Sequence, residues 1–196
     1  MTEPVSTDGR VARGERTRAA IATAFLDLVT EGDPRPGGRR IAERAGVSVR
    51  SIFQHFEDLE SLREEVLRVQ TERVRPLVED LDTTGDLDHR ISALVHQRGA
   101  LFEFIAPLRR SMTYVERGPA IEVGIVELGD LLRHQVGEQF RPELDAIPAH
   151  RRASVLAALD AMCAYESWDQ LRRGQGLTEA QSRRAVTVAV EQLLRP

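Results

Sequence analysis

The side chains best suited to a chemical task lie in residues 49–55. Arg50 has a planar guanidinium that can donate two hydrogen bonds to guanine O6 and N7, a contact that discriminates between bases by about 1–3 kcal/mol. Gln54, one helical turn later, can pair with adenine, and Val49 can pack against a thymine methyl group. These residue types at this spacing predict a short helix that reads the edges of base pairs in double-stranded DNA.

Neighbouring polar side chains suit the phosphate backbone, because hydroxyl, imidazole and guanidinium groups donate hydrogen bonds to phosphate oxygens. Each residue also has a structural alternative: Arg50 as a solvated charge, Ser48 as a helix cap, and His55 as a packing residue. Phe53 and Phe56 are most simply core residues. The DNA contacts predicted from these residues are Ser48, Val49, Arg50, Ser51, Gln54 and His55.

Two short helices joined by a tight turn would position this set. Apolar spacing and breaker residues predict helices over 39–45 and 49–55. Gly46 supplies a left-handed exit from the first helix, and Ser48 caps the second. This pattern is typical of a helix-turn-helix, whose second helix enters the major groove.

A third helix precedes this pair and ends at Gly32, with its apolar stripe at Ile21, Ala24, Phe25 and Leu28. The sequence therefore predicts a DNA-binding domain over residues 13–58. We expect the polar tail at residues 1–12 to be too hydrophilic to order itself.

The charge is divided unevenly along the chain. The net charge is -4, yet residues 10–56 carry nine arginines against five acidic residues, whereas residues 57–196 carry 18 arginines against 24 acidic residues. A basic segment attached to an acidic remainder predicts that only the segment meets a polyanion.

The 196-residue chain contains no lysine, since all 27 of its basic residues are arginine. This excludes P-loop nucleotide hydrolases and enzymes that form a Schiff base through lysine. Cys163 is the only thiol and is expected to be a small buried hydrophobe. With neither disulfide nor apolar targeting segment, the sequence predicts a cytoplasmic protein with no membrane contact.

Residues 59–196 are expected to be all-α, with six further helices. A long helix starts at Leu59 and would reach Asp82 unless Pro76 ends it early, and Pro107 is expected to open a separate helix. A single helix is expected over 149–173, and residues 178–181 read as a capping box for the last helix.

Residues 17–62 resemble the DNA-binding domain of the TetR family of bacterial transcriptional regulators. The resemblance rests on the run Ile41-Ala-Glu-Arg-Ala-Gly-Val-Ser48, on Ile52-Phe-Gln-His-Phe56, and on Leu62, and the helices that follow agree with the family's all-α ligand-binding domain. It implies a ligand-released repressor that binds a near-palindromic operator as a homodimer, and it adds Arg39 and Phe53 to the expected DNA contacts. It implies neither a cofactor nor a catalytic activity.

Three positions depart from the family pattern. Phe53 stands where members usually carry tyrosine, and Leu59 stands among acidic residues where they usually carry lysine. The entry to the second helix is Pro36-Gly37-Gly38, which gives a poorer cap. These departures predict weaker nonspecific DNA affinity, with positioning left to Arg39, Arg40, Arg44 and the N-terminal arginines.

The resemblance also implies where residues 59–196 bind their partners. The last two helices, 149–173 and 178–194, are the expected homodimer surface, with a stripe at Val186, Ala189, Val190 and Leu193 that could instead pack within one subunit. Bulky side chains are expected to line a pocket for a small, moderately hydrophobic effector: Phe102, Phe104, Met112, Tyr114, Ile125, Met162, Tyr165 and Trp168.

The alternative interpretation is a small all-α enzyme or ligand carrier that does not bind DNA. No nucleophile, base and orienting group fall into a recognisable catalytic arrangement, which disfavours an enzyme. His89 and His96 share a helix face, but no third ligand accompanies them at a recognisable spacing, so no metal site is predicted.

Overall fold

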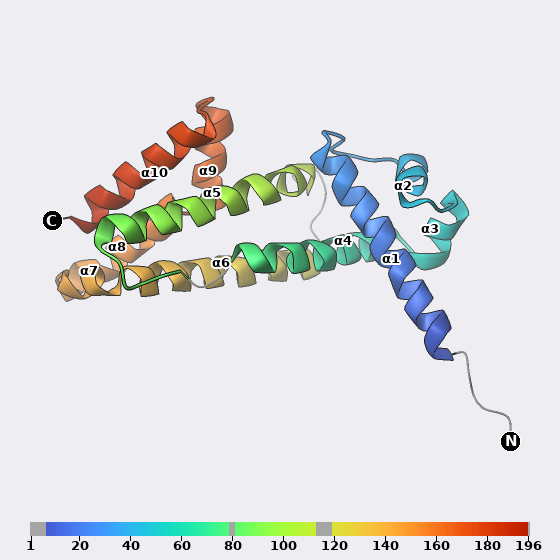
Figure 1. Ribbon diagram of the computed structural model, residues 1–196, viewed down its shortest axis with the longest axis horizontal. Coiled ribbons are helices and arrows are strands. Elements are labelled where there is room, and N and C mark those ends of the chain that lie inside the picture. The colour runs from blue at the N-terminus through green and yellow to red at the C-terminus, as the bar shows by residue number, and fades with distance from the viewer. Residues whose placement is uncertain (1–6, 79–80, 113–118, 196) are drawn as a thin grey trace, which may run out of the picture. The chain divides into compact units, whose positions relative to one another are not determined.

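The computed structural model describes residues 7–78, 81–112 and 119–195. In this part of the chain the regular structure is entirely helical, which confirms the all-α prediction (Figure 1). The helices are α1 (Thr7–Thr30), α2 (Gly38–Ala45), α3 (Val49–His55), α4 (Leu59–Val74), α5 (Leu87–Ser111), α6 (Pro119–Gln139), α7 (Arg141–Ala146), α8 (Ala149–Met162), α9 (Tyr165–Asp169) and α10 (Glu179–Leu194), with a 3₁₀ turn at Arg75–Leu77 and a π-helical turn at Gln170–Gly174.

The chain divides into two compact units. The first, here called the head, comprises residues 1–74 and 107–122, and the second, called the body, comprises residues 75–106 and 123–196. The sequence analysis placed the domain boundary between residues 58 and 59. In the structure, α4 packs with α1, and the C-terminal end of α5 contributes to the core of the head.

The core of the head forms where α1 packs against α2, α3 and α4, an arrangement visible in Figure 1. Ile21 and Ala22 of α1 are fully buried, so the apolar stripe predicted for this helix faces the core. The other helices contribute Ile41, Ala42, Ile52, Phe56, Leu62, Val66 and Leu108.

The helix ends of the head match the sequence analysis. Gly46 has φ of 68°, and its N–H donates to carbonyl oxygens at the end of α2. Ser48 Oγ accepts a hydrogen bond from the Ser51 N–H at 3.0 Å and so caps α3. Gly37 at the start of α2 provides no side-chain cap, as expected.

Arg18 of α1 fixes the C-terminal end of α3. Its guanidinium donates to the carbonyl oxygen of His55 and lies 4.4 Å from the centre of the Phe56 ring. The same side chain lies 3.9 Å from a carboxylate oxygen of Glu65 on α4. One arginine therefore joins three helices of the head.

Several predicted helix limits were wrong. The chain is already helical from Thr7, so residues 7–12 do not belong to an irregular tail. By contrast, α4 ends at Val74, which agrees with the expectation that Pro76 could end this helix early. In the described residues, seven α-helices follow α3 rather than six. The separate helix expected from Pro107 is part of α5, while the short α7 forms and the expected helix over 149–173 is interrupted. Ala164 is extended there, and the Ser167 hydroxyl donates to the Ala161 carbonyl at 2.6 Å.

Pro107 does not open a separate helix but lies inside α5. A proline removes one backbone hydrogen bond from a helix and favours a break. Here Ile105, Ala106 and Leu108 are all buried, so packing on both sides of the proline holds the helical path.

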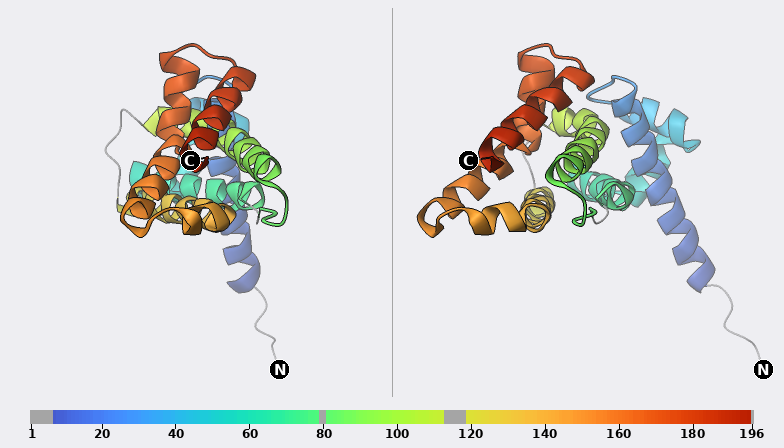
Figure 2. Two further views of the ribbon diagram at one scale, coloured as in Figure 1. Left: turned by 90° about the vertical axis from the view of Figure 1, so that its left-hand side faces the viewer. Right: turned by 60° about the vertical axis from the view of Figure 1, so that its left-hand side comes forward.

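In the body, α8 packs against α10, and α9 joins them through the loop before α10 (Figure 2). Trp168 of α9 is buried and donates its indole N–H to Glu103 of α5 at 2.8 Å, and Arg172 Nε donates to the same carboxylate at 2.6 Å. Thr178 and Gln181 form the predicted capping box of α10.

Arg90 joins three helices of the body. It donates to both carboxylate oxygens of Glu143 on α7 and, at 2.6 Å, to the Gln139 carbonyl at the end of α6. Arg90 is 5% exposed, and its hydrogen bonds hold the pKa of Glu143 below the ordinary value of 4.5. The ion pair is therefore largely withdrawn from water.

We expect Arg18→Met to lower the free energy of unfolding by about 1–2 kcal/mol, because the His55 carbonyl loses its donor and the Phe56 ring loses its cation. Urea denaturation measures the change. Arg13→Met, on an exposed position of the same helix, is the control and should have little effect. Equal stability of the two variants would contradict the role given to Arg18.

We expect Arg90→Met to lower the free energy of unfolding at neutral pH by about 3 kcal/mol, because it leaves the Glu143 carboxylate without its partner. A carboxyl group whose pKa is lowered in the folded protein stabilises the fold when the pH is above its ordinary pKa. This stabilisation is lost as the pH falls through the lowered pKa. The difference between wild type and variant should therefore shrink below about pH 4.5. Urea denaturation over a pH series tests this, and a pH-independent difference would contradict it.

Candidate functional site

Four residues of α3 form one exposed face. Val49 and Phe53 are 40% and 72% exposed, and Arg50 and Gln54 beside them are also exposed. Positions four apart on a helix lie above one another, so these two pairs form adjacent rows. Ile52 lies on the opposite side and is buried. The structure thus gathers on one surface the three residues predicted to read base edges.

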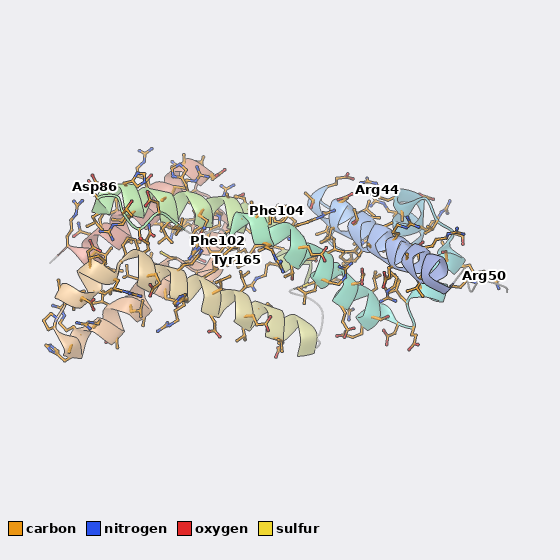
Figure 3. The ribbon with its side chains drawn as sticks, turned by 60° about the horizontal axis from the view of Figure 1, so that its bottom comes forward. Arg44, Arg50, Asp86, Phe102, Phe104 and Tyr165 are labelled. Carbon is orange, nitrogen blue, oxygen red and sulfur yellow. The ribbon has the colours of Figure 1, made fainter. Side chains whose placement is uncertain are left out.

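The guanidinium of Arg50 is available for a contact outside the chain. It makes no hydrogen bond or ion pair with any residue that the structure describes. Figure 3 shows Arg50 and Arg44 on separate parts of the head. A charged side chain without an internal partner on an exposed helix face can bind an external acceptor without breaking an existing bond.

Three of the other arginines predicted to position the head form ion pairs. Arg44 binds both oxygens of Glu31, at 2.7 and 2.5 Å, and this hydrogen bonding lowers the pKa of Glu31 and raises that of Arg44. Arg40 binds Asp33, and Arg39 binds Glu43 at 3.2 Å. Binding a phosphate through any of these three would compete with an acidic neighbour.

The expectation that Phe53 belongs to the core is wrong, whereas Phe56 is buried as expected. On the seven-residue α3, Ile52 and Phe56 already occupy the face toward α1, so Phe53 points away from the core. Its ring also lines an open hollow on the head that is formed mainly by apolar side chains, including Leu62.

The predicted phosphate contacts are distributed around the ends of α3. Ser48 is exposed and caps the helix, whereas Ser51 and His55 are half-buried. Beyond α3, Asp58 accepts hydrogen bonds from Ser61, which lower the pKa of the Asp58 carboxyl and keep it ionised. This edge of the head is therefore negatively charged, as the sequence indicated.

Arg18 is the residue of this site that the sequence analysis missed. It precedes Ile21 by three positions and so lies on the apolar stripe of α1. A charged residue on a buried stripe needs a hydrogen-bonding or charged partner. The position of Arg18 on this stripe was therefore the signal in the sequence that could have predicted its structural role.

Part of the expected effector pocket comes together in the body. Phe102 of α5 is buried and meets Tyr165 edge-on, with ring centres 6.0 Å apart. The ring centres of Phe102 and Trp168 lie 6.3 Å apart. Figure 3 shows Phe102 and Tyr165 beside each other. Ile125 and Met162 are half-buried in the same unit.

Two other residues of the expected pocket do not join this aromatic cluster. Phe104 is 40% exposed, because it lies two positions from Phe102 on another side of α5. Met112 packs against the core of the head. Tyr114 lies outside the described residues.

The stripe predicted for a dimer surface is partly internal. Val186 and Val190 are 3% and 0% exposed within the single chain, so they belong to the core of the body, and Ala189 and Leu193 are half-buried. The exposed side of α10 carries Val188 instead, which is 52% exposed.

The described residues hold no group of three side chains that could bind a metal ion. His96 Nδ1 lies 3.0 Å from the Ser92 carbonyl oxygen of its own helix, and His89 lies 3.9 Å from Asp82. Among the helices in the described ranges, none has the length and apolarity needed to span a membrane.

Solved structures show which proteins share this architecture. A TetR-family transcriptional regulator from Streptomyces coelicolor superimposes with a TM-score of 0.69 at 20% identity, over 91% of this chain and 80% of that one. A transcriptional regulator from Rhodococcus sp. Rha1 gives 0.67 at 17% identity, over 91% and 96% of the two chains. The multidrug binding protein EbrR, complexed with imidazole, gives 0.56 at 20% identity, over 88% and 93%.

The sequence itself matches no protein-family model and no curated protein. The structural likeness extends over about nine-tenths of the chain and includes both the head and the body. The chain therefore has the all-helical fold of the TetR-family transcriptional regulators.

Proposed function

We propose that the protein is a DNA-binding transcriptional regulator that reads its operator with α3. The observation that carries this proposal is the exposed face formed by Val49, Arg50, Phe53 and Gln54, in which Arg50 has no partner among the described residues. A guanidinium and an amide on the first two turns of a helix suit base edges in the major groove. The neighbouring Val49 and Phe53 suit thymine methyl groups and sugar edges.

The distribution of charge favours selective over nonspecific binding. Arg39, Arg40 and Arg44 are held by acidic residues of the head, so fewer cations are free to neutralise phosphates. Nonspecific affinity depends on the number of phosphates neutralised, and base contacts supply the selectivity. We therefore expect weak binding to arbitrary DNA and a large relative contribution from Arg50.

We propose that two copies associate through the exposed sides of α8 and α10, and that the dimer binds a near-palindromic operator. Small residues are exposed on α8 at Ala153, Ala157 and Ala161, and α10 presents Ala180 and Val188. Small side chains allow helices to approach closely, which favours a four-helix arrangement around a two-fold axis.

We propose that a small molecule bound in the body releases the dimer from DNA. The aromatic cluster of Phe102, Tyr165 and Trp168 offers apolar walls with polar tips. The structural neighbour EbrR is a multidrug binding protein complexed with imidazole, which supports small-molecule binding on this fold.

The helix α5 gives such a ligand a route to the head. Phe102 belongs to the body, whereas Leu108, six residues later on the same helix, is buried in the core of the head. A ligand that displaces α5 would therefore act on the packing that positions α3. Couplings between two sites of this kind are commonly about 1–3 kcal/mol.

Replacing Arg50 tests the assigned base contact. Duplexes enriched from a random pool by the wild-type protein serve as probes. In gel-shift titrations, Arg50→Ala should weaken binding to the preferred duplex by about 5- to 150-fold, while its affinity for scrambled DNA changes little. The control is Arg141→Ala, an exposed arginine of the body that pairs with Glu138. If Arg50→Ala keeps the affinity and sequence preference of the wild type, α3 is not the reading element.

Val188→Arg tests the proposed dimer surface, because it places a charge at the centre of the exposed side of α10. Sedimentation velocity should show a dimer for the wild type and a monomer for the variant. Val126→Arg, at an equally exposed position on α6, should leave the dimer intact. If Val188→Arg remains dimeric, the subunits meet through another surface.

A further inference from the structure

Two arginines of α5 are buried in the body, eight residues apart, and only one has its charge neutralised. Arg90 is 5% exposed and binds both oxygens of the Glu143 carboxylate. Arg98 is 2% exposed and forms no ion pair with any described carboxylate. Arg90 and Arg98 can therefore be compared directly, since both are buried arginines of α5 and only Arg90 has an ion-pair partner among the described residues.

The hydrogen-bond partners of Arg98 are all neutral. One terminal nitrogen donates to the side-chain oxygens of Gln97 at 2.6 Å and Gln135 at 2.9 Å, and the other donates to the Leu132 carbonyl at 2.9 Å. The Nε–H is buried and has no acceptor among the residues that the structure describes. The positive charge of the guanidinium thus has no counter-ion among these partners, and one of its N–H donors makes no hydrogen bond to any of them.

The surrounding side chains do not supply the missing negative charge. Asp160 acts on Arg98 only at a distance, since it binds Arg133 at 2.7 Å. Cys163 is also near, but burial raises the pKa of its thiol to about 12, so it is neutral. Burial lowers the pKa of Arg98 to about 10, which still leaves the guanidinium charged at neutral pH.

A buried charge without a counter-ion is costly, and proteins normally neutralise it with an acidic side chain or a bound ion. Arg98 carries this cost, because no described carboxylate pairs with its buried guanidinium. Phe102 lies one helical turn further along α5 and belongs to the aromatic cluster with Tyr165 and Trp168. The charge therefore adjoins the apolar part of the body in which the effector was proposed to bind.

We propose that Arg98 binds the carboxylate of the effector, which is then a small amphipathic carboxylic acid with an aromatic or aliphatic tail. One guanidinium, with the Nε–H free, can engage a carboxylate bidentately. A single cation among neutral amides matches a monoanion better than a doubly charged phosphate. The aromatic cluster receives the tail. This inference rests on the proposed effector site and specifies its chemistry.

The first test needs no ligand and compares the two arginines. Thermal unfolding should show that Arg98→Met leaves Tm unchanged or raises it, because an uncompensated buried charge is removed. Arg90→Met should lower Tm by about 6 °C or more, because a buried carboxylate loses its partner. An equal fall in Tm for both variants would show that Arg98 is a structural residue and would overturn the proposal.

The second test uses 4-phenylbutyrate and octanoate as probes, each beside its uncharged amide, with the full-length protein at pH 7. At about five times its dissociation constant, a bound carboxylate should raise the Tm of the wild type by about 2–4 °C, and the amides should raise it less. Arg98→Met should lose this preference, and the charge-retaining Arg98→Lys should keep part of it. The proposal is overturned if neither carboxylate stabilises the wild type more than its amide, or if Arg98→Met keeps the preference.

These measurements do not involve DNA, so their failure is distinct from failure of the proposed regulator. If the protein binds the carboxylates through Arg98 but the bound carboxylate does not lower its affinity for the operator, the anion site is supported and ligand-induced release is contradicted. If the protein binds and releases DNA but shows no preference for carboxylates over amides, the proposed regulator is supported and the role proposed for Arg98 is contradicted.

Discussion

Helices as short as α2 and α3, of eight and seven residues, have little stability of their own in water. They persist because Ile41 and Ile52 pack against α1 and because Arg18 holds the end of α3 through the His55 carbonyl. The packing of α3 against α1 thus determines the orientation of the exposed face of α3. In this head, Arg18 on α1 therefore helps to determine where the exposed side chains of α3 lie.

Local features of the sequence predicted the local features of the structure well. The exit at Gly46, the cap at Ser48 and the capping box at Thr178 depend on interactions within about four residues, which a sequence displays directly. The three base-edge candidates were also predicted, because helical spacing alone places them on one side of α3. Packing decided the remaining features. Pro107 stays helical because buried neighbours on both sides outweigh its preference for a break.

Ion pairing was the part of the site that the sequence could not predict. The partner of Arg44 is Glu31, 13 residues away on the far side of a loop, and nothing in the local pattern joins them. The chain has only arginine as a strong base, and the planar guanidinium readily forms paired contacts with carboxylates. In consequence many arginines of the head are engaged in ion pairs, whereas Arg50 is the arginine of α3 and has no such partner in the described structure.

The burial of Cys163 has a practical consequence for measuring motion in this protein. Its thiol is 4% exposed and has a raised pKa, so almost none of it is present as the reactive thiolate at neutral pH. A cysteine introduced at an exposed position of α3 could then be spin-labelled selectively without first removing the native one. In the proposed dimer, the distance between two such labels would report whether the two copies of α3 move apart when a ligand is added.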